Sequence, residues 1–433
     1  MKQRHALTRL AVPLGLTVLL LCARLFSAPA LSDPVAGAAP PSLRLAVPWV
    51  YLALAPLFTM WDGVSMLSMA RLQGFLIGLV GPYVAWRIAR LLWPKRAPVS
   101  GAKPGSAILK EIRILAVSLL LLAAFLVGGT VWHRPMLALT GADPRDMVVD
   151  FHSHTNVSHD VRNTLMRGFD TKANLRWHTR AGFDATFITD HNEVSRESGA
   201  GSQESGVGSQ ESGVGTRDAR AEQGSAVACP GIEVSAWRAH IVLLGDTLPV
   251  DRTRYNGSLD ELLTLLATSD STLGALSVAS LPEYRRNHWS QLDRLVAGGL
   301  DGFEVVNASP KANELPRTER DSVIALARAH NRFVVGVSDS HGWGATSMVW
   351  NLVHLPTGRR SDPCSAILNT LRTGFPSVSI IERHRLRPDS WWPVWLTPIG
   401  VVWETWRSMG WALTAAWLIY IWLWALRPRR TTR

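Results

Sequence analysis

Four short motifs, each at the end of an apolar run, carry histidine or acidic residues and limit what this chain can fold into. They are 147–155 (MVVDFHSHT), 189–192 (TDHN), 230–234 (PGIEV) and 337–341 (VSDSH). Side chains two positions apart on a strand point to the same face, so His152 and His154 can reach one metal ion. Several strand ends that deliver nitrogen and oxygen ligands to one place predict a metal centre at the edge of a sheet.

The segment 146–385 alternates between apolar runs of strand length and helix-like stretches. The expected strands are 147–152, 184–189, 226–233, 239–245, 274–279, 301–306, 332–338 and 348–355. The expected helices are 171–181, 258–268, 288–298, 314–330 and 363–373. This alternation predicts an α/β fold with βα units around a mostly parallel sheet. The length of the segment suits a βα barrel, whose active site lies at the carboxyl ends of the strands.

Apolar segments that could cross a membrane are concentrated at the two ends of the chain. Charged residues make up only 18% of the sequence, below the roughly 25% that is typical of soluble proteins. The expected spans are about 10–28, 72–93 and 114–132 in an N-terminal membrane region (1–140), and about 408–426 in a C-terminal anchor (390–433). The segment 48–69 is uncertain because Pro56, Asp62 and Gly63 interrupt it. The first apolar segment is a retained helix, which we favour, or a signal peptide cleaved near residue 30.

The net charge of +11 comes largely from basic residues that flank the apolar segments. This distribution is typical of membrane-flanking charge and argues against a nucleic-acid partner. The N-terminus, the loop 94–113 and the tail after residue 426 are rich in Lys and Arg, so we expect all three in the cytoplasm. Segment 146–385 then lies in the periplasm or another extracytoplasmic space, in a multi-pass protein of the cell (inner) membrane. This scheme makes 48–69 interfacial or re-entrant.

Two further features concern the segment 146–385. Residues 201–214 are a tandem repeat of GSQESGV within a stretch, 196–225, that is expected to be a flexible surface insertion. The chain has three cysteines and no CxxC, so no disulfide framework is predicted. Cys22 lies in an apolar segment, which leaves Cys229 and Cys364 as the one pair that could bond, a pairing that the sequence does not favour.

In order and spacing, 150–155 (DFHSHT), 189–192, 231–233 (GIE) and 338–341 (SDSH) resemble the successive motifs of the PHP (polymerase and histidinol phosphatase) superfamily. The resemblance covers about 146–345. It implies a distorted (β/α)7 barrel with a cluster of two or three divalent ions, for which Zn, Mn or Fe suit mixed imidazole and carboxylate ligands. The domain expected at 146–385 is then a metallohydrolase barrel flanked by transmembrane helices.

The resemblance also implies a role for each motif residue. The ligands of the first metal would be His152, His154, Glu233 and Asp339; those of the second Glu233 and His240; and those of the third His159, His191 and His341. Many members carry Asp at the position of His159, and either residue can serve. Glu233, Asp339 and His341 would be catalytic. Asp150 and Asp190 would support the ligands, Asp190 by orienting an imidazole.

One position departs from the family pattern. Leu281 stands where members commonly have the histidine of a His-Pro pair, which leaves the second metal either weakly held or held with the help of His288. Nearby, Arg285 and Arg286 could grip a phosphate, because a guanidinium binds two oxygens at once, or they could belong to a solvated loop. Asn307 at another strand end could contact substrate or cap the following turn.

The function that these features predict is a membrane-anchored, metal-dependent phosphoesterase that hydrolyses a phosphomonoester with water activated by metal. Its expected partners are a small phosphorylated substrate and the lipid bilayer, and no nucleic acid. The alternative is a non-catalytic sensor domain that binds a metal or a phosphorylated ligand at the membrane. A proofreading nuclease, as some relatives are, is disfavoured because the chain contains no polymerase sequence.

Overall fold

The structure is a computed structural model that describes residues 2–92, 104–193, 225–245, 250–355 and 362–427. The chain divides into two compact units, each assembled from segments that are far apart in the sequence. The helical unit comprises Met1–Ala30, Val47–Pro135 and His384–Arg433, and the sheet unit comprises Leu31–Ala46 and Met136–Arg383. Nearly all of the insertion expected at 196–225, part of the loop 94–113 and most of the basic tail lie outside the described residues.

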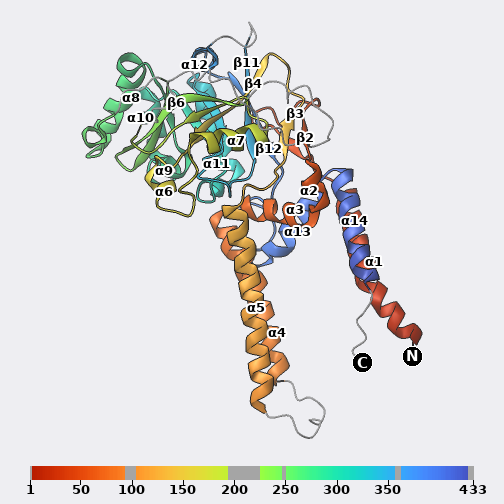
Figure 1. The fold of residues 1–433 in the computed structure, drawn as a ribbon. Helices are drawn as coiled ribbons and strands as arrows, with labels where there is room; N and C mark the ends of the chain where they lie inside the picture. Colours follow the sequence, from red (N-terminus) through yellow and green to blue (C-terminus); the bar gives the residue numbers. More distant parts are fainter. Residues whose placement is uncertain (1, 93–103, 194–224, 246–249, 356–361, 428–433) are drawn as a thin grey trace. The chain divides into compact units, whose positions relative to one another are not determined.

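The sheet unit is built around one curled, ten-stranded sheet (Figure 1). In chain order its strands are β1 (Leu31–Ser32), β4 (Asp146–Ser153), β5 (Ala185–Ile188), β6 (Val227–Ala236), β7 (Ala239–Leu244), β8 (Leu276–Ala279), β9 (Gly302–Asn307), β10 (Phe333–Val337), β11 (Val349–His354) and β12 (Val378–Arg383). Across the sheet the order is β1-β12-β11-β4-β5-β6-β7-β8-β9-β10. A small separate sheet pairs β2 (Arg44–Ala46) with β3 (Ala138–Thr140).

Parallel and antiparallel pairs share the large sheet. β4, β5 and β6 pair in parallel, as do β8, β9 and β10, whereas β7 is antiparallel to both neighbours and β11 is antiparallel to β4 and β12. Strands occur in all eight stretches where the sequence predicts them, which confirms the α/β class. The sheet is mixed rather than mostly parallel, however, and β12 and the edge strand β1 were not expected. Because of this mixed pairing, the sheet does not consist of seven successive βα units, so the expected (β/α)7 barrel is not confirmed.

The sheet curls until the end of β10 meets the end of β4. Asn351 on β11 connects them, since its amide nitrogen donates to the backbone of β4 at 2.9 Å and to Gly336 O at 2.6 Å. Beyond the strand ends, Asp339 N donates to His152 O at 2.9 Å. Position 336 requires glycine, because a Cβ there would run into Val349. This closure brings the first and last sequence motifs side by side.

Helices of one to four turns connect the strands of the sheet unit. They are α6 (His159–Arg162), α7 (Thr171–Ala181), α8 (Leu259–Leu273), α9 (Leu281–Asn287), α10 (Leu292–Ala297), α11 (Arg317–Ala329) and α12 (Pro363–Leu371), with 3-10 turns η1 (Arg252–Arg254), η2 (Trp289–Gln291) and η3 (Ala312–Glu314). Three of the described helices, α7, α8 and α12, have a side-chain N-cap. In α8, Ser258 accepts from Glu261 N, and Gly274 ends the helix at a φ of 64°. The five expected helices are confirmed, whereas α6 and α9 were not expected.

Two tryptophans anchor the core on the outer side of β4. Trp177 of α7 and Trp350 of β11 are fully buried in a cluster that includes Val148 and Phe183. Trp350 Nε1 donates to Ala181 O at 2.8 Å, so its one polar atom is satisfied. This packing fixes β4, and with it the first two histidines, against the rest of the sheet.

The helical unit contains α1 (Lys2–Leu25), α2 (Trp49–Ala53), α3 (Ala55–Ser65), α4 (Met69–Leu92), α5 (Pro104–Val131), η4 (Val394–Leu396), α13 (Thr397–Ser408) and α14 (Trp411–Leu426). Within the described residues, Met69–Arg90 and Ile108–Val131 are long and apolar enough to cross a membrane, and Leu10–Leu25 and Trp411–Leu426 are shorter apolar helices. Segment 48–69 forms α2 and α3 rather than one continuous helix. Length and composition alone do not establish a crossing, so multi-pass insertion stays a prediction.

Buried arginines join distant segments within the helical unit. Arg71 of α4 donates to the carbonyl oxygens of Trp392 at 2.6 Å and of Ser390 at 3.0 Å. Arg134 Nη1 lies 2.8 Å from Asp62 Oδ1, and each side chain is only 1% exposed. A buried pair of this kind is costly to break, because either charge left alone would be uncompensated. α4 lies beside α5 and α1 beside α14 in this unit (Figure 1).

Cys229 and Cys364 form a disulfide, contrary to the expectation from the sequence. Cys229 is buried on β6, and Cys364 lies in the first turn of α12. The two cysteines are 135 positions apart in the chain, and their Cα atoms are 5.5 Å apart. Only the tertiary fold determines such proximity, so the cysteine spacing could not reveal it.

Breaking this disulfide is predicted to destabilise the sheet unit. In Cys364→Ser we expect a loss of about 2–4 kcal/mol in unfolding free energy, because the open chain gains conformational entropy when unfolded. Thermal unfolding of the full chain in detergent, followed by circular dichroism, measures the change. Cys22→Ser is the matched control, since Cys22 is a free thiol in α1. A midpoint in Cys364→Ser equal to that of the control would contradict the prediction.

Candidate metal centre

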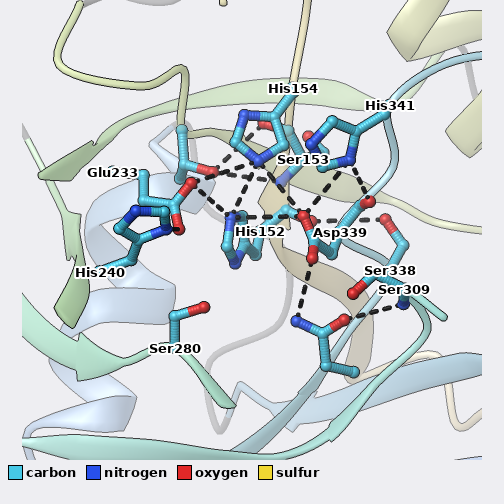
Figure 2. A network of polar contacts seen from close by, with 12 residues as sticks. His152, Ser153, His154, Glu233, His240, Ser280, Ser309, Ser338, Asp339 and His341 are labelled. Atoms are coloured by element: carbon cyan, nitrogen blue, oxygen red, sulfur yellow. Dashed lines mark hydrogen bonds and ion pairs between the residues drawn. The ribbon is translucent and has the colours of Figure 1, made fainter. Parts of the chain in front are cut away.

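The expected ligands come from the ends of neighbouring strands, and their side chains point toward one another (Figure 2). His152 is on β4 and His154 follows it; Glu233 is on β6 and His240 on β7; His191 lies beyond β5, and Asp339 and His341 lie beyond β10. His191 also forms a bridge with the backbone of Glu233, which ties the end of β5 to β6. Strand register therefore sets the positions of most of these groups.

The first group is His152, His154 and Asp339. The two imidazole Nε2 atoms are 3.0 Å apart, and Asp339 Oδ1 lies 3.7 Å from that of His152 and 3.3 Å from that of His154. Ligand atoms about 2.1 Å from a tetrahedral ion are themselves about 3.4 Å apart. The spacing therefore fits three ligands of one divalent ion.

Glu233 lies between the first group and a second one, which is His191, Glu233 and His240 (Figure 2). Its Oε2 is 3.3 and 3.4 Å from the Nε2 atoms of His152 and His154, and its Oε1 is 3.0 Å from His240 Nδ1. Burial raises the pKa of Glu233, but His152 and His240 outweigh it and hold that pKa well below its ordinary value. Burial lowers the pKa of His240, but Glu233 outweighs it and raises that pKa to about 9.

Buried polar atoms without hydrogen-bond partners also point to a bound cation. Among the described residues, Glu233 Oε2 and His191 Nδ1 have none. The side chain of Glu233 is 2% exposed and that of His191 is 9% exposed. An unsatisfied buried polar group costs about 1–3 kcal/mol, and more when it is charged, unless a partner is supplied. Divalent ions would supply that partner, so the residues present fit the cluster that the resemblance implies.

Asp160, rather than His159, contributes to the third group. Asp160 Oδ2 lies 2.6 Å from His341 Nε2 and 3.1 Å from His191 Nε2. These three residues, with His154, form the third group of possible ligands. His159 is exposed and belongs to none of the three groups, although its ring centroid lies 5.2 Å from that of His191. The side chains of consecutive helix residues point about 100° apart, so α6 can direct only one of His159 and Asp160 toward the cluster.

The charges of the cluster are mixed. Burial opposes protonation of His341, but Asp339 and Asp160 outweigh it and raise the pKa of His341 to about 9. Burial, and then the nearby His341, lower the pKa of His154 to about 4. Burial raises the pKa of Asp339, whereas His152 and His341 lower it by more, to well below its ordinary value. Ionised carboxylates thus face neutral and protonated imidazoles around one small volume.

Glu304 of β9 orients His152. Its Oε1 lies 2.6 Å from His152 Nδ1, and its Oε2 accepts from Leu281 N and Asn307 Nδ2, each at 2.9 Å. In the sequence, a single acidic residue within the apolar strand 301–306 was the signal that could have identified Glu304. Asn307 also donates to Asp339 Oδ2 at 3.2 Å, so it contacts the cluster. A carboxylate that holds the second nitrogen of an imidazole fixes its tautomer and strengthens it as a ligand.

Asp150 and Asp190 support the site through partners other than those expected. Asp150 accepts a hydrogen bond from Ser338, and it lies 2.8 Å from the buried side chain of His178. Asp190 Oδ1 accepts from Thr155 N at 2.6 Å rather than orienting an imidazole. Both aspartates thereby hold the backbone that follows or faces the ligand histidines.

Asp339 has a backbone conformation that favours glycine, with a φ of 47°. Few residues other than glycine adopt this left-handed region, and the surrounding contacts must hold them there. Asp339 N donates to His152 O, and His154 N donates to Ser340 O at 3.0 Å. The two hydrogen bonds fix this turn so that the Asp339 carboxylate faces the histidines.

The predicted substrate residues other than Asn307 lie around α9. Arg285 and the exposed Arg286 line a cavity of about 400 Å³, to which Lys311 also contributes. Arg285 Nε is paired with Glu319 Oε2 at 2.6 Å, so this guanidinium is already partly engaged. His288 is buried against Trp237, with Nε2 3.1 Å from Trp237 O, and it belongs to none of the three groups.

Comparison with known proteins adds little to this geometry. No family model and no curated protein matches the chain. PsfC from Pseudomonas syringae PB-5123 is similar at a TM-score of 0.34 and 16% identity, over 61% of this chain and 98% of PsfC. A candidate metal-dependent phosphoesterase from Bifidobacterium adolescentis is similar at 0.30 and 16%, over 52% of this chain and 96% of that one. Similarity at this level carries no conclusion about the reaction.

The assignment of Asp160 can be tested against its neighbour His159. Asp160→Asn removes a charged oxygen that faces two imidazoles, so we expect metal affinity to fall by about 10- to 100-fold or more. His159→Asn changes an exposed ring and should leave metal content intact. Metal analysis of the two variants after equilibrium dialysis against Zn²⁺ makes the comparison. Loss of metal in His159→Asn but not in Asp160→Asn would reverse the assignment.

Proposed function

We propose that this chain is a metal-dependent phosphoesterase that hydrolyses a phosphomonoester. The observation that carries the proposal is the first group, in which two imidazole nitrogens and a carboxylate oxygen lie 3.0 to 3.7 Å apart. Glu233 adds an unpartnered oxygen beside it. This donor set suits Zn, Mn or Fe and favours two or three ions rather than one.

The residues of the cluster would have different roles in metal binding and proton transfer. The first group and Glu233 would hold the ion nearest the sheet, and Glu233 would connect it to the second group. Divalent ions in such a cluster activate water at neutral pH and neutralise phosphoryl oxygens. The side chain of His341 is 37% exposed, unlike those of His152 and His154, which are almost completely buried. His341 is therefore the motif imidazole best placed to meet the leaving group and protonate it.

The basic cavity beside α9 supports a small phosphorylated substrate. Arg286 and Lys311 line it, and Pro282 and Trp289 add an apolar wall. Positive groups beside apolar surface suit an anionic ester that has an organic part. No nucleic-acid partner is proposed, because the excess positive charge of the chain lies mainly beside its apolar segments.

A generic phosphomonoester tests the proposal. The full chain in detergent should hydrolyse p-nitrophenyl phosphate when Mn²⁺ or Zn²⁺ is present. His154→Ala removes a ligand of the first group, so turnover should fall by more than the roughly 10- to 100-fold that outer partners contribute. His354→Ala is the matched control, because His354 is half exposed and pairs with Asp146. Folded, metal-loaded protein without turnover above that of His154→Ala would favour a sensor that binds metal or a phosphorylated ligand.

We further propose that the chain is a multi-pass protein of the cell membrane with its sheet unit outside the cytoplasm. The apolar helices Met69–Arg90 and Ile108–Val131 and the basic residues around them support insertion. The disulfide between Cys229 and Cys364 supports the location, since disulfides persist mainly in oxidising compartments. A periplasmic or extracytoplasmic site would limit the substrate to phosphate esters found there.

A topology reporter tests this orientation. An alkaline phosphatase fused after residue 145 should be active, because that enzyme matures only where disulfides form. A fusion after residue 100, in the basic loop, should be inactive and serves as the control. An inactive fusion at 145, with expression confirmed by immunoblot, would place the sheet unit in the cytoplasm.

A further inference from the structure

His191 contributes to two of the three groups through different nitrogens. Its Nδ1 lies 3.1 Å from Glu233 Oε2 in the second group, and its Nε2 lies 3.1 Å from Asp160 Oδ2 in the third. A neutral imidazole has one nitrogen that can accept and one that carries a proton, so it binds one ion. When the third group uses Nε2 of His191, the second group keeps only Glu233 and His240. An ion there needs another ligand.

Glu283 in the first turn of α9 faces the second group. Its Oε2 lies 3.9 Å from His240 Nδ1, and its side chain is 24% exposed. Among the described residues this long ion pair is its one polar contact. The same His240 Nδ1 lies 3.0 Å from Glu233 Oε1, so two carboxylates face one imidazole nitrogen. Two carboxylates this close are unfavourable neighbours unless a cation lies near both.

The neighbours of Glu283 do not offer an alternative ligand. Leu281 is apolar and 1% exposed, so it packs in the core. His288 is turned to the backbone of Trp237. Arg285 is a cation and is paired with Glu319 of α11. Glu283 is therefore the residue of α9 that reaches the second group.

We propose that Glu283 is a ligand of a divalent ion at the second group, together with Glu233 and His240. Its carboxylate supplies the donor that the sequence lacks at Leu281. The proposal rests on the metal centre proposed above and adds a residue to it. A carboxylate in place of an imidazole also adds a negative charge. This charge favours a harder ion such as Mn²⁺ at the second group more than at the other two groups.

Metal binding by the full chain in detergent tests the proposal directly. Mn²⁺ titration followed by electron paramagnetic resonance gives the number and affinity of bound ions without any substrate. In Glu283→Gln, which keeps the shape of the side chain, we expect the weakest site to lose about 10- to 100-fold in affinity or to disappear. Glu319→Gln is the matched control, because Glu319 is also a partly exposed carboxylate, pairs with Arg285 and belongs to none of the three groups. It should match the wild type.

A second measurement uses the wild-type protein, so it does not depend on how a variant folds. Carbodiimide coupling to glycine ethyl ester labels accessible carboxylates, and peptide mass spectrometry reads each site. Mn²⁺ should reduce labelling of Glu283 severalfold and leave labelling of Glu319 unchanged. Bound Mn²⁺ with equal labelling of Glu283, or with equal affinity in Glu283→Gln, would overturn this inference alone. A wild type that binds no ion would overturn the metal centre as well.

Discussion

The candidate site depends on the contact between the end of β10 and the end of β4. Asp339 donates its backbone N–H to His152 O, and His154 donates to Ser340 O, so the first and last motifs become neighbours. Without this closure Asp339 and His341, beyond the edge strand β10, would lie several strands away from the histidines of β4. Asn351 and the glycine at 336 allow the close approach on which the closure depends. The chemistry therefore follows from how far the sheet curls rather than from any single ligand.

Electrostatics explains why so many polar groups are buried together. Carboxylates and imidazoles alternate around the cluster, and each lowers the cost of charging the other. Even so, Glu233 Oε2 lacks a hydrogen-bond partner among the described residues, and Glu283 faces like charges. Protein groups alone leave both carboxylates incompletely neutralised. Divalent cations would neutralise both carboxylates, and the sharing of His191 would limit how many imidazoles each ion receives.

Sequence periodicity predicted the strands well, because each apolar run of the expected length became a strand. It placed His152, His154 and Asp339 at or just beyond strand ends, whereas β6 continues past Glu233 to Ala236. It did not separate His159 from Asp160, because the start of a one-turn helix cannot be located to one residue. The bond between Cys229 and Cys364 was missed for a different reason: it joins residues that only the tertiary fold brings together.

The ligands also differ in how firmly the fold holds them. His152 and Glu233 lie on strands, His154 follows β4 directly, and all three are at most 2% exposed, so register and packing fix them. Asp160 and Glu283 come from the short helices α6 and α9, and their side chains are 27% and 24% exposed. A rigid inner face therefore meets an outer face that can adjust. Since His240 and His341 are also partly exposed, the outer face is the side from which a substrate can approach.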